Sequence, residues 1–137
     1  MPRPIQANID MGALESNLQV ARRAAPSSRV MAVIKADGYG HGLLRAAEAL
    51  AGADGYALLD IRDAVQLRDS GFRQTILLLE GFFSAEDLPV IAEHDLTCVI
   101  HSAEQIALLD AYPGSSPRGK GALDVWLKVN SGMNRLG

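Results

Sequence analysis

Five short apolar runs, separated by segments with helical spacing, constrain the fold of this chain more than any other feature of its sequence. The runs are mostly continuous rather than alternating, which is typical of strands covered on both faces of a parallel sheet. The predicted strands are Val30–Ile34, Gly55–Leu59, Thr75–Leu79, Leu96–Ile100 and Leu123–Val129. Alternating strands and helices imply right-handed βαβ units, so we predict an α/β fold with a parallel sheet. This pattern leaves two architectures open, an open doubly wound sheet and a TIM barrel.

Polar residues at capping positions mark where several of the helices begin. Asp10 precedes a predicted helix, and Asp60 stands before a second one that starts at Ile61. Ser102 is followed three residues later by a glutamine, which is the spacing of a capping box, and Ser84 is followed at the same distance by an aspartate. Because a proline at position 89 follows Ser84 closely, we expect that helix to be irregular.

The composition excludes several functional classes. The chain has 137 residues, with 13 Lys and Arg against 16 Asp and Glu, and its net charge is −3. Such a charge gives no basic surface for nucleic acid or for an anionic membrane. The apolar runs are too short to span a bilayer and the amino terminus lacks a signal peptide, so we expect a cytoplasmic protein. The single cysteine, Cys98, allows no intrachain disulfide, and the scattered histidines predict no metal site.

The segment Ala32–Gly42, with the sequence Ala-Val-Ile-Lys-Ala-Asp-Gly-Tyr-Gly-His-Gly, is the most informative about function. Lys35 ends an apolar strand, and functional groups collect at the carboxyl ends of parallel strands. Partial shielding from water favours the neutral amine, which can attack a carbonyl carbon. The three glycines would let backbone N–H groups approach an anion, and Tyr39 adds a hydroxyl. An amine beside a phosphate-binding turn suits pyridoxal 5'-phosphate, whereas a surface lysine before a tight turn is the simpler alternative.

Two of the unusual segments of the chain resemble motifs of one enzyme family. Ala32–Gly42 resembles the cofactor-lysine motif of alanine racemases, and Trp126–Gly137 resembles a second motif of the same family. Leu77–Phe83 also fits the family, and Arg3–Asp10 looks most like its catabolic branch. The motifs stand in the right order, and the resemblance covers essentially the whole chain but only about the first third of a family member.

This resemblance implies a TIM barrel, which decides between the two architectures that the periodicity leaves open. Residues 1–137 would form the N-terminal part of a barrel domain that binds pyridoxal 5'-phosphate, with about five of its eight strands. The rest of the barrel and a C-terminal β domain would be absent, so we expect the chain to be part of something larger. A further strand candidate, Ile5–Ile9, would then lie outside the barrel, and Tyr112–Gly121 would be a surface connection.

The resemblance also implies roles for individual residues. Lys35 would hold the cofactor through its Nζ and move the Cα proton on the D-alanine side, and Tyr39 would lie near the cofactor phosphate. Arg135 would face the phenolic oxygen of the cofactor and the carboxylate of the substrate. Lys128 stands where some members carry a carbamylated lysine, which could pair with Arg135 through charge-assisted hydrogen bonds. His41 would only cap or line the glycine-rich loop.

The expected function is therefore the pyridoxal phosphate-dependent racemisation of L-alanine and D-alanine, of the catabolic type. The second acid or base would be a tyrosine of the C-terminal domain, contributed by the other subunit of a homodimer, so we predict that the isolated segment is inactive. Its partners would be alanine and the remaining part of the same enzyme. Two alternatives stay open, a non-catalytic barrel that carries pyridoxal phosphate and an inactive truncated fragment. The presence of Arg135 favours the racemase, because a carrier has less need to bind a substrate carboxylate.

Overall fold

The computed structural model describes residues 4–114 and 123–137, which form one parallel sheet with helices on its outer side. In these residues the strands are β1 (Met31–Val33), β2 (Gly55–Leu58), β3 (Thr75–Leu78), β4 (Thr97–Ile100) and β5 (Val125–Leu127). Each lies inside its predicted run, so the five strand predictions are confirmed. The spatial order is β1-β2-β3-β4-β5. A doubly wound sheet would reverse its order at a switch point, and this sheet does not, so the order is that of a barrel.

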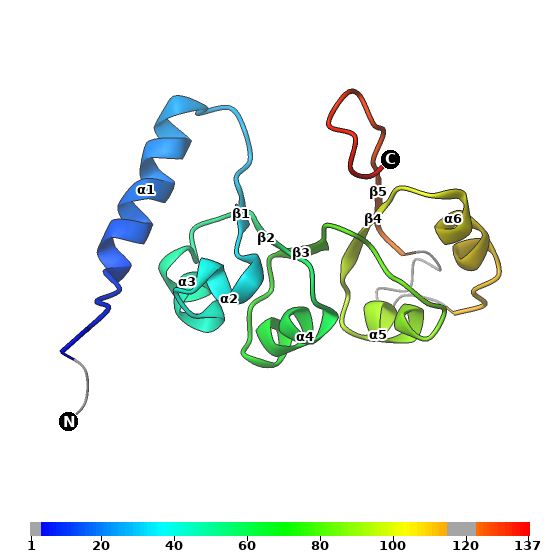
Figure 1. Cartoon of the computed structure of the whole chain (residues 1–137), viewed down its shortest axis with the longest axis horizontal. Helices are drawn as coiled ribbons and strands as arrows, with labels where there is room; N and C mark the ends of the chain where they lie inside the picture. Colours follow the sequence, from blue (N-terminus) through cyan, green and yellow to red (C-terminus); the bar gives the residue numbers. More distant parts are fainter. Residues whose placement is uncertain (1–3, 115–122) are drawn as a thin grey trace.

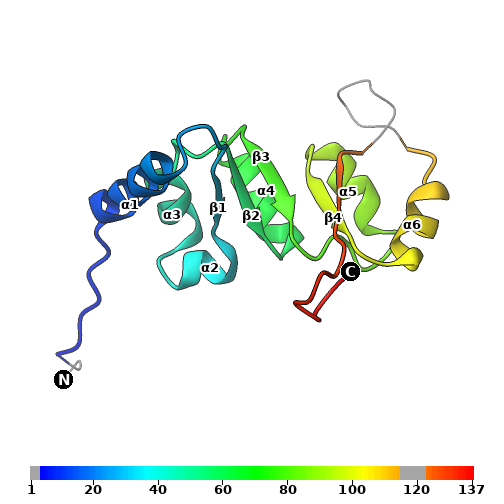
Figure 2. The ribbon, with the colours of Figure 1, turned by 90° about the horizontal axis from the view of Figure 1, so that it is seen from above.

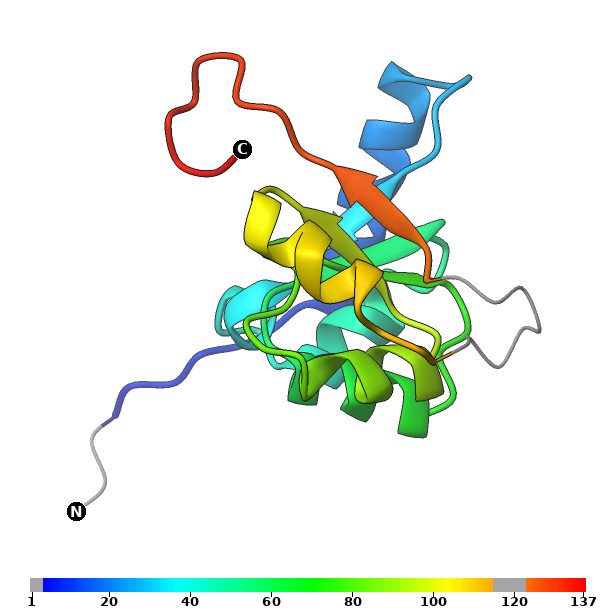
Figure 3. The same cartoon turned by 90° about the vertical axis from the view of Figure 1, so that its right-hand side faces the viewer.

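The helices cover the convex side of the curved sheet (Figure 1). They are α3 (Leu43–Ala49), α4 (Ile61–Asp69), α5 (Asp87–Glu93) and α6 (Ala103–Asp110), each of which follows a strand. A longer helix, α1 (Met11–Ala24), precedes β1 and lies at one end of the sheet. The segment before α1 extends away from the rest of the molecule (Figure 3). None of the helices within residues 4–114 and 123–137 is long and apolar enough to cross a membrane.

The main core lies between the sheet and these helices. Its largest buried side chains include Tyr56, Leu58, Leu67, Ile76 and Ile91. The concave face of the sheet carries a smaller cluster, formed by Ala57, Leu77 and Val99 with Met31 and Leu79 packed against it. Since successive side chains of a strand point to opposite faces, β1 to β4 contribute one face to each cluster, whereas the three residues of β5 are exposed.

Three of the predicted helix starts have the expected capping bonds. The side chain of Asp10 accepts a hydrogen bond from the Ala13 N–H at 3.0 Å, and that of Asp60 accepts one from the Arg62 N–H at 2.9 Å. The Ser102 hydroxyl accepts one from the backbone N–H of Gln105 at 3.3 Å.

Two local expectations are wrong. We expected a helix capped by Ser84, but α5 begins only at Asp87, whose carboxylate accepts a hydrogen bond from the Ser84 N–H at 3.2 Å. Pro89 then falls in the first turn, where no intrahelical N–H bond is lost, so it does not disturb the helix. Ile5–Ile9 forms no strand, because this segment does not pair with the sheet. Of the expected connection Tyr112–Gly121, residues 115–121 lie outside the described part of the chain.

The amino ends of β3 and β4 are joined by one buried arginine. The guanidinium of Arg68 donates to the carbonyl oxygens of Phe72 and Gln74, which precede β3, at 2.9 and 2.8 Å. It also donates to those of His94 and Asp95, which precede β4, at 2.8 and 2.9 Å. These four bonds fix the two loops at this edge of the sheet.

Candidate functional site

β1 leads directly into a left-handed turn, α2 (Lys35–Tyr39). Ala36 and Asp37 have φ of 54°, Gly38 has φ of 61° and Tyr39 has φ of 55°. The left-handed conformation costs a residue with a side chain about 1–2 kcal/mol, so it normally occurs at single residues. A run of this kind persists only where the surroundings hold it, and such strain is concentrated at functional sites.

Helix α3 holds this turn in place. A side-chain oxygen of Asp37 accepts a hydrogen bond from the Leu43 N–H at 2.7 Å, and the Asp37 carbonyl accepts one from the Gly42 N–H at 2.9 Å. Gly38 is buried against α3, and a Cβ atom at this position would lie 2.8 Å from the Cβ of Ala46. The lack of space therefore requires a glycine here, and a glycine also avoids the cost of the left-handed conformation.

Five backbone N–H groups of this segment, including those of its three glycines, donate hydrogen bonds within it. Those of Gly38, Gly40, His41, Gly42 and Leu43 each donate to an oxygen atom of a residue between Ile34 and Gly38. The prediction that they would be free to approach an anion is therefore wrong, because the glycines serve the left-handed turn and its junction with α3. The Nδ1 of His41 lies 2.8 Å from the Gly38 carbonyl oxygen, which confirms that His41 caps the loop.

Lys35 lies where β1 enters the turn, at the carboxyl edge of the sheet, and is half-buried. It follows β1, in which Met31 packs in the cluster on the concave face of the sheet. The residue before it, Ile34, is buried and its N–H donates to the Ala57 carbonyl at 2.9 Å, so the backbone at this point is fixed to β2. No hydrogen bond or ion pair to the Nζ of Lys35 occurs in the described part of the chain. The amine is therefore available to a ligand.

Tyr39 lies in the same turn as Lys35, and its side chain is largely exposed. The structure thus brings these two predicted residues together at the end of one strand. A phenol in this place can donate a hydrogen bond to a ligand held by the lysine.

Lys128 and Arg135 follow β5. Lys128 is half-buried, and its N–H donates to the Ile100 carbonyl at 2.8 Å, which continues the pairing with β4. Because β5 is parallel to the other strands, the segment that follows it lies at the same edge of the sheet as the turn α2 (Figure 2). Lys128 is the first residue of that segment. Arg135 is exposed, in a segment where the side chain of Asn130 accepts hydrogen bonds from two backbone N–H groups. Among residues 123–137 and 4–114, no hydrogen bond or ion pair joins Arg135 to Lys128, so their pairing stays a prediction.

A pocket of about 360 Å³ lies at the same edge, beside the ends of β2 and β3. It is lined by Leu59, Asp60, Ile61, Glu80, Gly81, Phe83 and Asp87. The side-chain hydrogen bond from Arg62 lowers the pKa of Asp60, which is therefore anionic at neutral pH. The Phe83 ring is exposed at the rim of this pocket.

The loop at the rim of this pocket is held by Gln105, a residue whose role sequence reasoning missed. Its buried amide nitrogen donates to the carbonyl oxygens of Phe82 at 3.0 Å and Glu80 at 3.2 Å, and its amide oxygen accepts from the His101 N–H at 2.9 Å. The sequence presents Gln105 only as part of a capping box. Its partners in the loop after β3 are distant in sequence, so no local pattern indicates them.

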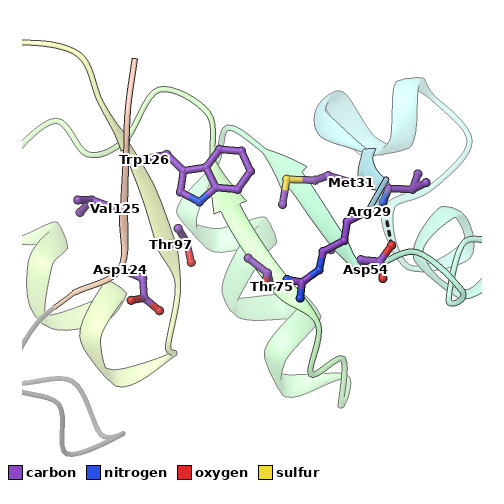
Figure 4. A pocket seen from close by; sticks show the side chains of 10 residues that line it. Arg29, Met31, Asp54, Thr75, Thr97, Asp124, Val125 and Trp126 are labelled. Atoms are coloured by element: carbon purple, nitrogen blue, oxygen red, sulfur yellow. Dashed lines mark hydrogen bonds between the residues drawn. The ribbon is translucent and has the colours of Figure 1, made fainter. Parts of the chain in front are cut away.

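A second cavity, of about 350 Å³, lies at the opposite edge of the sheet (Figure 4). It is lined by residues at the amino ends of the strands, among them Arg29, Thr75, Thr97 and Trp126. The dashed line in Figure 4 marks the hydrogen bond of 2.8 Å from the Val30 N–H to Asp54. Functional groups of β/α barrels gather at the carboxyl ends of the strands, so the edge that carries Lys35 is the candidate active site.

Comparison with known proteins gives the family of this fold and site. The family described as "Alanine racemase, N-terminal domain" matches residues 9–137. The chain belongs to the alanine racemase family. It is 61% identical over all of its 137 residues to an alanine racemase of Nitrosospira multiformis, and it spans 37% of the length of that relative.

Solved structures of the family confirm the barrel architecture. The structure of the biosynthetic alanine racemase of Pseudomonas aeruginosa is 38% identical and has a TM-score of 0.86, over 94% of this chain and 35% of that one. A histidine racemase of Leuconostoc mesenteroides is 29% identical and has a TM-score of 0.75, over 93% of this chain and 34% of that one. The strands of this chain thus correspond to the first part of the barrel in racemases, and racemases named for different amino acids share this part.

Proposed function

We propose that this chain carries the cofactor lysine, Lys35, of a pyridoxal phosphate-dependent enzyme that interconverts L-alanine and D-alanine. The observation that carries the proposal is the position of Lys35. It is a half-buried amine without a partner in the described residues, at the carboxyl edge of a barrel sheet, and it enters a turn that is held in a costly conformation. Membership of the alanine racemase family supports the same conclusion.

The residues at this edge fit pyridoxal phosphate in part. A primary amine is the group that bonds to the cofactor's aldehyde, and Lys35 supplies one. The exposed hydroxyl of Tyr39 can donate to the phosphate. Because the N–H groups of Gly38, Gly40 and Gly42 are already hydrogen-bonded within the segment, we expect the other phosphate contacts to come from elsewhere in the enzyme.

Each residue has a distinct task in this proposal. When bound, pyridoxal phosphate withdraws electrons from the amino acid and makes its Cα proton more acidic. Lys35 accepts or returns the Cα proton on one face, and a second group must do the opposite on the other face, so no oxidant is consumed. The guanidinium of Arg135 would bind the substrate carboxylate and the cofactor's phenolic oxygen. A carbamylated Lys128 would be anionic and could hold Arg135 in position.

The assignment of this chain to a larger, dimeric enzyme goes beyond the described residues. We propose that residues 1–137 are the N-terminal part of the barrel domain of a cytoplasmic enzyme. A homodimer would supply the second base as a tyrosine from a C-terminal domain. The 37% share of the relative's length supports such a division. The catabolic assignment rests on Arg3–Asp10, of which residue 3 lies outside the described part of the structure.

Borohydride trapping in the natural full-length chain tests this proposal. After incubation with pyridoxal phosphate, reduction and digestion, we expect a pyridoxyl group on the peptide that contains Lys35, and none there in the Lys35→Ala variant. The full-length chain should convert D-alanine to L-alanine, and the 137-residue segment alone should not. A labelled full-length chain without turnover would favour the carrier protein, and an unlabelled one would refute the assignment of Lys35 as the cofactor lysine. Substantial turnover by the segment alone would refute the predicted need for a second base.

A further inference from the structure

The left-handed turn after β1 contains three residues with side chains, Ala36, Asp37 and Tyr39, that would not adopt this conformation by themselves. Their cost must be offset by contacts with a fixed part of the molecule. Asp37 makes the shortest of these contacts, since its side-chain oxygen lies 2.7 Å from the Leu43 nitrogen. Its carbonyl oxygen also accepts from the N–H groups of Gly42, at 2.9 Å, and Gly40, at 3.1 Å.

Helix α3, to which Asp37 is bonded, is itself fixed to the sheet. Leu43, Ala46 and Ala47 are buried in the main core. The hydroxyl of Tyr56 on β2 donates to the Ala47 carbonyl at 2.8 Å. A continuous set of contacts therefore runs from β2 through α3 to Asp37, and Asp37 lies two residues after Lys35.

Aspartate suits this position in two respects. Asp and Asn adopt the left-handed conformation more readily than other residues with side chains. Their side-chain oxygen can also accept from a helix N-terminal N–H group.

The charge of Asp37 has no cationic partner in the described residues. The pKa of the nearby Asp63 is raised by burial first, and also by the charges of Asp60 and Asp37.

We infer that Asp37 is a positioning residue for Lys35: the hydrogen bond from the Leu43 N–H to its side-chain oxygen holds the turn that sets the direction of the lysine and of Tyr39. The oxygen, and not the charge, performs this task. The inference rests on the proposed function in one respect, which is that Lys35 is the cofactor lysine.

Three substitutions of Asp37 in the natural full-length chain separate these contributions. Asp37→Asn keeps an accepting oxygen and removes the charge. Asp37→Gly keeps the left-handed conformation accessible and removes the oxygen, and Asp37→Ala removes both advantages. The primary measurement is the rate at which Lys35 acquires a pyridoxyl group with pyridoxal phosphate and borohydride, normalised to the folded fraction from circular dichroism.

We expect Asp37→Asn to label within about twofold of the wild type, because the bond to Leu43 remains. Asp37→Gly and Asp37→Ala should label on the order of tenfold more slowly, which corresponds to the loss of one hydrogen bond. Amide hydrogen exchange of Gly42 and Leu43 should accelerate in the same two variants. Asp95 offers a matched control, because it is an aspartate with φ of 51° at the opposite edge of the sheet. Asp95→Ala should lower the unfolding midpoint and leave the labelling of Lys35 unchanged.

Two results would overturn the inference. One is a loss of labelling in Asp37→Asn as large as that in Asp37→Ala, which would assign the effect to the charge. The other is wild-type labelling in both Asp37→Gly and Asp37→Ala. If the wild-type chain acquires no label on Lys35, the proposed function fails instead. In that case amide hydrogen exchange alone tests whether Asp37 holds the turn. An unchanged exchange rate of the Leu43 amide in Asp37→Ala would overturn the inference.

Discussion

The amide nitrogen of Gln105 lies 3.0 Å from the carbonyl oxygen of Phe82, so the first turn of α6 holds the loop that follows β3. Gln105 is buried and bonds three backbone groups of that loop and of the end of β4. A leucine of similar size would remove these three hydrogen bonds. We therefore expect Gln105→Leu to lower the free energy of unfolding by about 2–3 kcal/mol, measured by urea denaturation.

The exposed Gln66 on α4 provides the control for this substitution. Gln66→Leu should change the free energy of unfolding by no more than about 0.5 kcal/mol. Equal effects of the two substitutions would mean that the hydrogen bonds of Gln105 contribute little to holding the loop.

The close packing of Gly38 against Ala46 leads to a second prediction, about the stability of glycine-to-alanine variants. Gly38→Ala places a methyl group 2.8 Å from the Cβ of Ala46, in addition to the cost of a positive φ. Gly40→Ala, also at a positive φ but with nothing within 4 Å of the added Cβ, carries the conformational cost alone. We expect about 1 kcal/mol of destabilisation for Gly40→Ala and about 1–3 kcal/mol more for Gly38→Ala, both by thermal or urea unfolding.

A double substitution isolates the steric part of this effect. Ala46→Gly removes the atom that Gly38→Ala would strike, so the two changes together should cost less than the sum of their separate effects. Strict additivity would show that the contact does not restrict position 38.

The buried phenol of Tyr56 makes the stability of the fold depend on pH. Burial raises the pKa of Tyr56 from 10.0 to about 12, so the folded state favours the neutral phenol. This contribution is fully present below pH 10 and is lost as the pH rises from about 10 to about 12. Tyr56→Phe should cost about 1 kcal/mol at pH 7, through the lost bond to the Ala47 carbonyl, and should flatten the decline above pH 10.

Unfolding free energies measured from pH 8 to pH 12 check this prediction. Burial also raises the pKa of the Cys98 thiol, to about 11, so both proteins should carry Cys98→Ala to remove that overlapping titration. An equally steep decline in the phenylalanine variant would contradict the assignment to Tyr56.

The strands could be predicted because hydrophobic burial determines them locally. Leu77, Leu78 and their neighbours form continuous apolar runs, and such runs predict buried parallel strands whatever the remainder of the fold. The choice between barrel and doubly wound sheet could not be made from periodicity, because both architectures bury the same runs. That choice needed the strand order, or the resemblance to a family.

The site could be predicted only as far as residue types indicate chemistry. The glycines after Lys35 indicated a turn, but they gave no sign of its hand or of the use of its N–H groups. The left-handed conformation of Ala36 depends on Asp37 and on the packing of Gly38 against α3, and these contacts form only in the folded chain. For the same reason the sequence alone does not predict the contacts of Gln105 with the loop after β3.

Arg68 gathers four carbonyl oxygens at the edge of the sheet that lies away from Lys35. These four bonds contribute to the stability of the fold at a distance from the candidate site. Substitutions at this edge can therefore change the protein's resistance to heat without altering the immediate surroundings of Lys35.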